Sequence, residues 1–171
     1  MAMNLRKNPF VCLLISLGRL LIGKVKYSSD YVGTTVKLEN GETYKIFRHI
    51  RSMPQSNNKQ GSVFIVNFIF ARLSQNANRL VSQLPMLLIT GFPGFRVKMY
   101  AVNKENGYWL GIYQWESKQA LDAYKRSFVL RIMNCRASEG YVTYHELDQY
   151  SLTDYIDEHK IDDTQSQLKI I

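Results

Sequence analysis

The sequence has little cysteine: Cys12 and Cys135 are the only two in 171 residues, and they lie far apart. Disulfide-stabilised secreted domains and zinc sites both need more cysteines at close, regular spacings. The scarcity therefore predicts a cytoplasmic protein without a disulfide framework or a bound metal. Apolar residues make up 46% of the chain, which is enough to form a folded core.

The sequence also lacks the short motifs of several common enzyme classes. It contains no nucleophile elbow, no phosphate-binding loop, no dinucleotide-binding glycine pattern and no paired metal-ligand motif. It has no internal repeat and no low-complexity tract. No reaction is therefore predicted from a local motif.

Acidic residues are scarce in the first third of the chain. Residues 1–61 hold ten Lys and Arg but three Asp and Glu, a net charge of +7. The remainder holds twelve basic and eleven acidic residues, a net charge of +1. Because the larger part is almost neutral, the sequence argues against a nucleic-acid partner.

The apolar run near the N-terminus is too short for a membrane-spanning helix. Phe10–Gly23 has fourteen residues and is interrupted by Arg19, whereas a span needs about 20. No Ala-x-Ala-like cleavage site follows it. We predict a short apolar helix that either packs on its own domain or a partner subunit, or lies in an anionic membrane surface on the inner face through residues 1–26. The flanking cations are Arg6, Lys7, Lys24 and Lys26.

Turn signals and periodicity divide the chain into elements. Asn40-Gly41 predicts a β-hairpin, and the polar stretch 52–62 predicts a linker. Pro85 is expected to end or kink the helix that contains it. The predicted elements are a hairpin of strands 34–38 and 43–50, strand 63–70, helix 73–90, strands 95–102 and 108–115, helix 117–136, strand 141–147 and helix 151–159.

The order of elements after residue 62 predicts the fold class. Strand, helix, strand, strand, helix, strand is the split βαβ, ferredoxin-like α+β arrangement, with two helices on one face of an antiparallel sheet. Because so small a domain has nothing to cover the other face, we predict a homodimer that closes into a dimeric α+β barrel. The predicted units are an N-terminal helix and β-hairpin extension (1–61), the barrel domain (62–158) and a polar tail (159–171).

The strands between Phe95 and Trp115 each have two unlike faces. One face is aliphatic, and we expect helices to pack on it. The other face is cationic and aromatic, which is typical of a pocket wall or a subunit interface. Its side chains are Arg96, Lys98, Tyr100, Trp109, Tyr113 and Trp115.

Three segments carry a family resemblance: Phe-Pro-Gly-Phe-Arg-x-Lys at 92–98, Gly-Tyr-Trp-Leu-Gly-Ile-Tyr-x-Trp-Glu-Ser at 107–117 and Ala-Leu-Asp-Ala-Tyr at 120–124. Over about residues 62–158 the chain resembles the dimeric α+β barrel superfamily, most closely its antibiotic-biosynthesis-monooxygenase and YdhR-like groups. The resemblance implies a homodimer with a pocket lined by Asn67 and Trp109. Residues 117–136 contain no His, which argues against haem degradation.

These observations lead to a first predicted function, a cofactor-independent monooxygenase of a small aromatic or polycyclic substrate. Asn67, Trp109 and His145 are its catalytic candidates, with His145 moving a proton. Arg96 and Lys98 would stabilise an anion, while Tyr100, Tyr113 and Trp115 would line the pocket. Each of these residues also has a plain packing or surface interpretation.

Two other functions remain open from the sequence. The barrel could bind a small apolar molecule or a lipid without catalysis, because both functions need the same pocket. Alternatively, the barrel could serve only to dimerise a protein that docks on a membrane or a partner.

Overall fold

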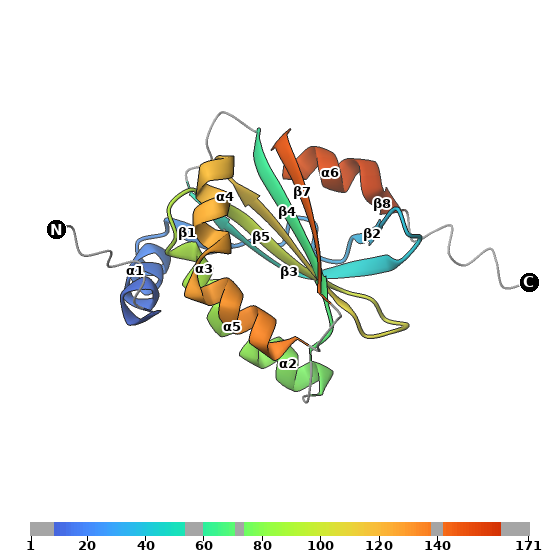
Figure 1. Ribbon diagram of the computed structural model, residues 1–171, viewed down its shortest axis with the longest axis horizontal. Helices are drawn as coiled ribbons and strands as arrows, with labels where there is room; N and C mark the ends of the chain where they lie inside the picture. The colour runs from blue at the N-terminus through green and yellow to red at the C-terminus, as the bar shows by residue number, and fades with distance from the viewer. Residues whose placement is uncertain (1–8, 54–59, 71–73, 138–141, 162–171) are drawn as a thin grey trace, which may run out of the picture.

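The computed structural model describes residues 9–53, 60–70, 74–137 and 142–161. Within them, an antiparallel sheet runs in the order β7-β4-β6-β5-β3-β2-β8, with β1 also paired to β3 (Figure 1). The strands are β1 (Val25–Tyr27), β2 (Thr35–Lys37), β3 (Thr43–Ser52), β4 (Gly61–Phe68), β5 (Phe95–Val102), β6 (Trp109–Trp115), β7 (Thr143–Tyr150) and β8 (Lys160–Ile161).

The helices of the described chain follow the predicted positions closely. They are α1 (Pro9–Leu21), α2 (Gln75–Val81), α3 (Gln83–Thr90), α4 (Lys118–Lys125), α5 (Phe128–Arg136) and α6 (Leu152–His159). The strand order β7-β4-β6-β5, with α2–α3 between β4 and β5 and α4–α5 between β6 and β7, is the ferredoxin-like arrangement. The predicted α+β fold class is therefore confirmed.

The N-terminal hairpin belongs to the same sheet as the ferredoxin-like strands. β2 and β3 pair around a turn in which Gly41 has a φ of 87°, a conformation that glycine adopts without strain. β3 then pairs with β5 from Lys45–Val102 to Arg51–Val97. Most of the predicted linker, residues 54–59, lies outside the described residues, and the division into three units stays a prediction.

Each of the two predicted helices is broken into two; a break or kink was predicted from Pro85 in the first, but none was predicted in the second. Between α2 and α3 the break falls at Ser82, close to Pro85, which has no N–H to donate to the preceding turn. Between α4 and α5 the break falls at Arg126 and Ser127, and the Ser127 hydroxyl caps α5 by accepting from the Leu130 N–H. The breaks let each helix pair follow the twisted sheet.

The two faces of the sheet are covered in the opposite way from the prediction. The aromatic face lies under α2–α5, where Trp115 stacks on Tyr124 of α4 with ring centroids 4.8 Å apart. The aliphatic face, with Met99, Leu110 and Ile112, lies on the other side. Large rings bury about 150–250 Å² each, so they fill the space between a sheet and a helix layer well. We call the α2–α5 side the inner face and the other side the outer face.

The outer face is covered by the chain itself. The side chains of Leu152, Tyr155 and Ile156 on α6 are buried against Ile65 and Ile112 of the sheet. Figure 1 shows α6 on the opposite side of the sheet from α4 and α5. The homodimer was predicted because the small domain was expected to leave one sheet face uncovered. That reason is wrong, since α6 covers the face, and the homodimer itself stays a proposal.

Helix α1 packs on α3 through one side. Cys12 and Ser16 are fully buried, and Arg19 donates to the carbonyl of Thr90 and to Ser52 Oγ, the latter at 2.9 Å. The opposite side carries Phe10, which is 75% exposed, with further exposed apolar side chains. None of the helices in the described part of the chain is long and apolar enough to cross a membrane.

Candidate functional site

A cavity of about 410 Å³ lies on the outer face, between β4, β6, β7, the C-terminal half of α6 and the β2–β3 turn. We call it the outer pocket. Two predicted catalytic candidates, Asn67 and His145, line it. The other lining residues include Leu38, Ile65, Leu110, Thr143, Tyr150, Tyr155, Glu158 and His159. Its mixture of aliphatic walls with a few polar groups is typical of a small-molecule site.

Asn67 is held in place by a hydrogen-bond network. Its Nδ2 donates to Tyr44 Oη at 2.8 Å, and Tyr44 donates to Glu42 Oε2 at 2.8 Å. Glu42 also accepts from Asn40 at 2.9 Å and from Asn106 at 3.0 Å. These bonds fix the amide so that Oδ1 is its remaining polar atom. Oδ1 is buried and has no hydrogen-bond partner among the described residues.

The network also sets the protonation of its members. Burial acts to raise the pKa of Glu42, but the hydrogen bonds from Asn40, Tyr44, Asn106 and Asn67 outweigh it and lower the pKa. Burial, and then the bond to Glu42, raise the pKa of Tyr44. Near neutral pH, Glu42 is therefore an anion and Tyr44 a neutral donor, which is the state that orients Asn67.

His159 contributes a proton acceptor to the outer pocket. Its Nδ1 lies 2.9 Å from the carbonyl oxygen of Tyr155, and because a carbonyl can only accept, Nδ1 carries the proton. In the neutral ring Nε2 then holds a lone pair. The ring stacks on Tyr155 with centroids 4.2 Å apart. Burial, followed by the charge of Glu39, raises the pKa of Tyr155 to about 12.

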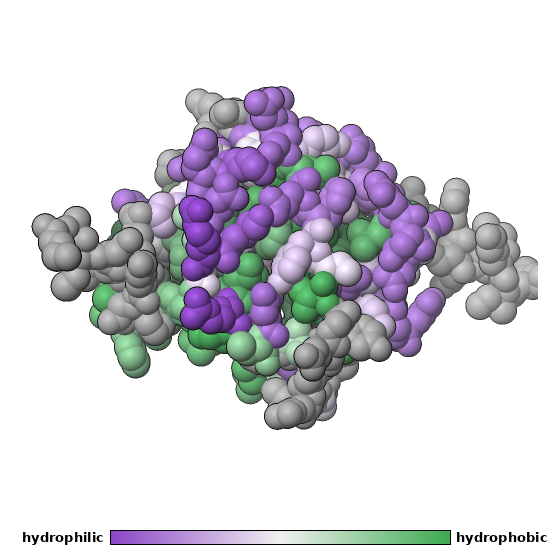
Figure 2. Space-filling view, viewed as in Figure 1, coloured by the Kyte–Doolittle hydropathy of each residue, from purple (hydrophilic) through white to green (hydrophobic). Residues whose placement is uncertain are grey.

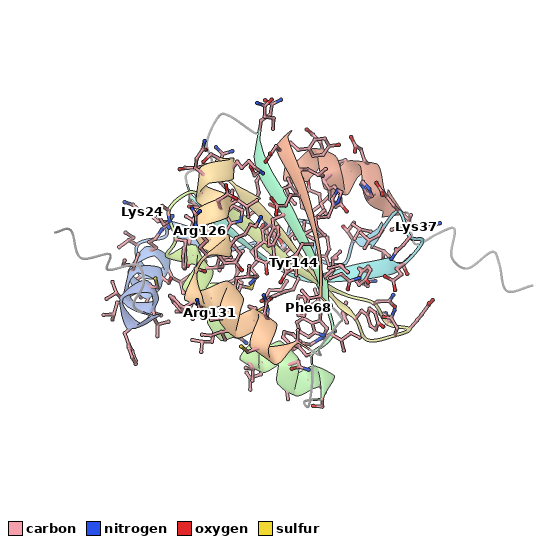
Figure 3. All side chains as sticks on the ribbon, viewed as in Figure 1. Lys24, Lys37, Phe68, Arg126, Arg131 and Tyr144 are labelled. Carbon is pink, nitrogen blue, oxygen red and sulfur yellow. The ribbon has the colours of Figure 1, made fainter. Side chains whose placement is uncertain are left out.

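His145 is an exposed residue of the edge strand β7, opposite Ile65 of β4. The pocket therefore has a histidine on each of two elements, one on the sheet and one on α6. Tyr144 beside it is labelled in Figure 3, on the strand that forms this edge. Tyr144 stacks on Phe64 with centroids 5.6 Å apart, which holds β7 against its neighbour.

The predicted ligand-stacking residues lie together, but in the core of the inner face. Trp109, Tyr100, Tyr113 and Trp115 are fully buried, and Trp109 packs between Phe47 and Phe70 at centroid distances of 5.0 and 4.9 Å. Arg96 is not among them: its Nη1 donates to the carbonyl of Gln60 at 2.8 Å. Asn67 and His145 thus share a cavity from which Trp109 is separated by the sheet.

Lys98 is the least usual member of the inner-face cluster. Its side chain is fully buried, and Nζ lies 4.4 Å from the ring centroid of Tyr100 and 4.8 Å from that of Tyr113. Nζ has no hydrogen-bond partner among the described residues. Burial lowers the pKa of Lys98 well below its ordinary value, and the charge of Arg48 lowers it further. The rings of Tyr100 and Tyr113 occupy the space beside Nζ. A ligand anion, which Lys98 was predicted to stabilise, would therefore have to displace them.

Tyr155 and His159 were not among the site residues predicted from the sequence. They are four residues apart on α6, so they lie on the same side of the helix as each other. That spacing was visible in the sequence, but it gave no indication of which strand α6 would cover. The prediction also placed His159 in the polar tail, where no site was expected.

Comparisons with known proteins give similarities of structure only. Neither a scan of protein-family profiles nor a search of curated sequences finds a match. An anthrone oxidase-like protein is similar at 13% identity and a TM-score of 0.45, over 65% of this chain and 59% of that one. The match thus spans less than two thirds of that protein.

Two solved structures match over more of their length. A haem-degrading enzyme from Listeria monocytogenes is similar at 14% identity and a TM-score of 0.48, over 76% of this chain and 90% of its own. A monooxygenase-like protein from Listeria innocua has the same identity and TM-score, over 80% and 86%. The solved structures to which this chain is similar thus include monooxygenase-like and haem-degrading proteins.

Proposed function

We propose that the outer pocket binds a small, uncharged aromatic molecule that carries a phenolic hydroxyl group. The observation that carries this proposal is Asn67 Oδ1, a buried acceptor that has no hydrogen-bond partner among the described residues and belongs to a residue lining a cavity of about 410 Å³. An unpaired buried polar atom is costly, and a hydroxyl donor from a ligand would relieve that cost. The aliphatic side chains of Ile65 and Leu110 offer a surface for the ring.

We further propose monooxygenase-like chemistry in this pocket, without a metal or an organic cofactor. His159 Nε2, with His145 as the alternative base, would accept the phenolic proton, and the resulting electron-rich anion would reduce O₂. Conversion of a substrate CH₂ to C=O supplies four electrons. One oxygen atom of O₂ then enters the substrate, and the other leaves as water. The protein's part is to orient the anion and to hold the proton.

The test uses 1,8-dihydroxyanthrone, which has both phenolic groups and an oxidisable CH₂. We expect saturable binding without O₂, and then product with consumption of one O₂ per turnover. Asn67→Ala is expected to weaken binding about tenfold, and His159→Gln to lower turnover more than binding. Asp157→Asn, on the exposed side of α6, is the matched control. Binding without any turnover would refute the enzyme and favour the carrier.

A role in haem degradation is not proposed, because the residues do not fit haem. Residues 117–136, which include α4, contain no His to bind the iron. The space between α4 and the sheet is filled by Trp115 and Tyr124, both fully buried and stacked on each other. A macrocycle could enter there only by displacing these rings.

We also propose that α1 holds the cytoplasmic protein at an anionic membrane surface. The exposed side of α1 presents a row of apolar side chains, which we call the ridge; green atoms are visible in this region at the lower left of Figure 2. Its members are Phe10, Leu14, Leu17 and Leu21, followed by Ile22. The spacing of four, three and four residues keeps them on one side of the helix.

Cations lie beside this ridge. Lys24 and Lys26 follow α1 directly, and both are exposed, as is Tyr27, a residue type common at membrane interfaces. Figure 3 shows Lys24 near α1. Each cation near an anionic lipid surface contributes about 1 kcal/mol. We expect sedimentation with vesicles of phosphatidylcholine and phosphatidylglycerol at low salt, and its loss in Leu14→Ser/Leu21→Ser.

Vesicles of phosphatidylcholine alone are the control for charge, and Val32→Ser, an exposed apolar residue outside α1, is the control for apolar area. Absence of pelleting at low salt would refute the membrane proposal. If the mass in solution instead depends on Leu14 and Leu21, the ridge is an interface between two copies of the chain.

A further inference from the structure

A second cavity, of about 340 Å³, lies on the outer face near the N-terminal end of α6. None of the described residues lines both this cavity and the outer pocket. Val97 and Met99 of β5 and Leu152 of α6 form its apolar wall. Its polar lining consists of His49 and Arg51 of β3, Asp30 and Tyr31 of the β1–β2 connection, Gln114 of β6 and Thr153 of α6. We call this cavity the His49 pocket.

His49 is buried, with 4% of its surface exposed, and its orientation is fixed from one side. Its Nδ1 lies 2.8 Å from the carbonyl oxygen of Asp30, so Nδ1 carries the proton and Nε2 of the neutral ring has the lone pair. Nε2 is buried and has no hydrogen-bond partner among the described residues. A ligand group that pairs with His49 Nε2 must therefore donate a hydrogen bond.

Arg51 supplies the complementary group. Its Nη1 forms an ion pair with Asp30 Oδ2 at 2.9 Å, which leaves Nε as a donor. Nε too is buried and lacks a hydrogen-bond partner among the described residues. A ligand atom beside Arg51 must therefore accept a hydrogen bond. The carboxylate of Asp30 balances the charge of Arg51. Burial lowers the pKa of His49, which favours its neutral form. The site therefore fits an uncharged ligand.

The spacing of these two groups limits the shape of the ligand. His49 and Arg51 are two residues apart on β3, so their side chains leave the same face of the strand about 7 Å apart. The donor and the acceptor of the ligand must have a comparable separation. Val97 and Met99 favour an aromatic ring between the donor and the acceptor of the ligand, since the thioether of Met99 makes good contacts with rings.

We propose that the His49 pocket binds a small uncharged aromatic compound with a hydroxyl and a carbonyl group on opposite sides of its ring. The hydroxyl donates to His49 Nε2, and the carbonyl oxygen accepts from Arg51 Nε. The ring rests on Val97, Met99 and Leu152. This site is separate from the outer pocket and does not depend on the function proposed for it.

The three histidines of the chain allow a test that separates the two cavities, because His145 and His159 line the outer pocket and His49 lines the second one. The probe is 4-hydroxyacetophenone, and 4-methoxyacetophenone is its matched control, which has no hydrogen-bond donor. Both are titrated into the full-length protein while the ring carbon-13 and nitrogen-15 signals of each histidine are followed.

We expect 4-hydroxyacetophenone to shift the His49 signals saturably, and the methoxy compound to bind at least tenfold more weakly. His49→Asn keeps a donor to the Asp30 carbonyl but has no acceptor at the Nε2 position, so it should abolish binding measured by calorimetry. Arg51→Lys keeps the charge but loses Nε, and should weaken binding about tenfold.

Three outcomes would overturn the proposal: no shift of His49 at millimolar probe, equal binding of the two compounds, or shifts confined to His145 and His159. The last would assign the probe to the outer pocket. The comparison of the two compounds on the unmodified protein decides the question even if His49→Asn does not fold.

Discussion

Lys98 shows how one buried residue affects the stability of the whole protein. Its amine lies between two tyrosine rings, which compensate only part of the lost hydration. We predict that Lys98→Met raises the free energy of unfolding at pH 7 by about 1–3 kcal/mol, the usual cost of an unsatisfied buried polar group. Urea denaturation followed by tryptophan fluorescence measures it.

The pH dependence of the same variant provides a second measurement. The pKa of Lys98 is below its ordinary value of 10.5 in the folded protein, so the unfolded chain binds more protons between the two pKa values. Stability of the natural protein should therefore rise with pH between the folded-state pKa of Lys98 and 10.5, by about 1.4 kcal/mol for each unit of pH in which Lys98 alone titrates. The difference between the protein and Lys98→Met should shrink as the pH rises.

Trp109 illustrates the difference between a site residue and a core residue. Its ring is fully buried among Phe47, Phe68, Phe70 and Tyr100. We predict that Trp109→Phe lowers the free energy of unfolding by about 2 kcal/mol, because a smaller ring leaves a cavity. The affinity of the outer pocket for its probe should stay the same. A changed affinity with unchanged stability would instead support the catalytic role predicted from the sequence.

Among the elements, α1 depends on a close approach to the end of α3. A Cβ added at Gly91 would lie 2.7 Å from the carbonyl oxygen of Cys12 and 2.8 Å from Ser16 Oγ. The carbonyl oxygen of Cys12 is part of the helix backbone and cannot move without moving the helix, so we predict that Gly91→Ala detaches α1 and destabilises the protein by about 1–3 kcal/mol.

Thiol labelling measures this detachment directly. Cys12 on α1 is buried and Cys135 is exposed, so the natural protein should react slowly at Cys12 and quickly at Cys135. In Gly91→Ala the slow thiol should become fast, while Cys135 serves as the internal standard. An unchanged rate at Cys12 would show that α1 tolerates the extra methyl group in place.

At the scale of the whole molecule, α6 decides whether the outer face is covered. Ile156 is fully buried against the aliphatic side of the sheet. We predict that Ile156→Glu displaces α6, because an unpaired charge cannot stay in that core. The exposed face should then drive self-association, detected by light scattering as a rise in mass over the unmodified protein. An unchanged mass with a folded spectrum would contradict this.

The mass of the unmodified protein in solution tests the proposed homodimer. Since α6 already covers the outer face, an interface between two copies must lie elsewhere on the surface. A constant mass of two chains over a wide range of concentrations would support the homodimer. A single-chain mass at every concentration would refute it.

The sequence by itself determined most of the elements and their order, but not the short strands β1 and β8 or the break between α4 and α5. The alternation in Phe95–Val102, the Asn40-Gly41 turn and the Ser74 and Ser117 caps are local features, because neighbouring residues suffice to favour a strand, a turn or a helix start. The ferredoxin-like arrangement followed from that order, since few topologies accommodate it.

Only the tertiary structure decided which face of the sheet meets which layer. Alternation shows that Tyr113 and Ile112 point to opposite faces, but both residues gain from burial, so the pattern cannot choose their partners. Contacts between residues distant in the sequence decide the partners. Tyr113 packs on Tyr124 of α4, and Ile112 lies in one cluster with Ile156 of α6. Asn67 and His159 share a cavity for the same reason: the docking of α6 brings them together.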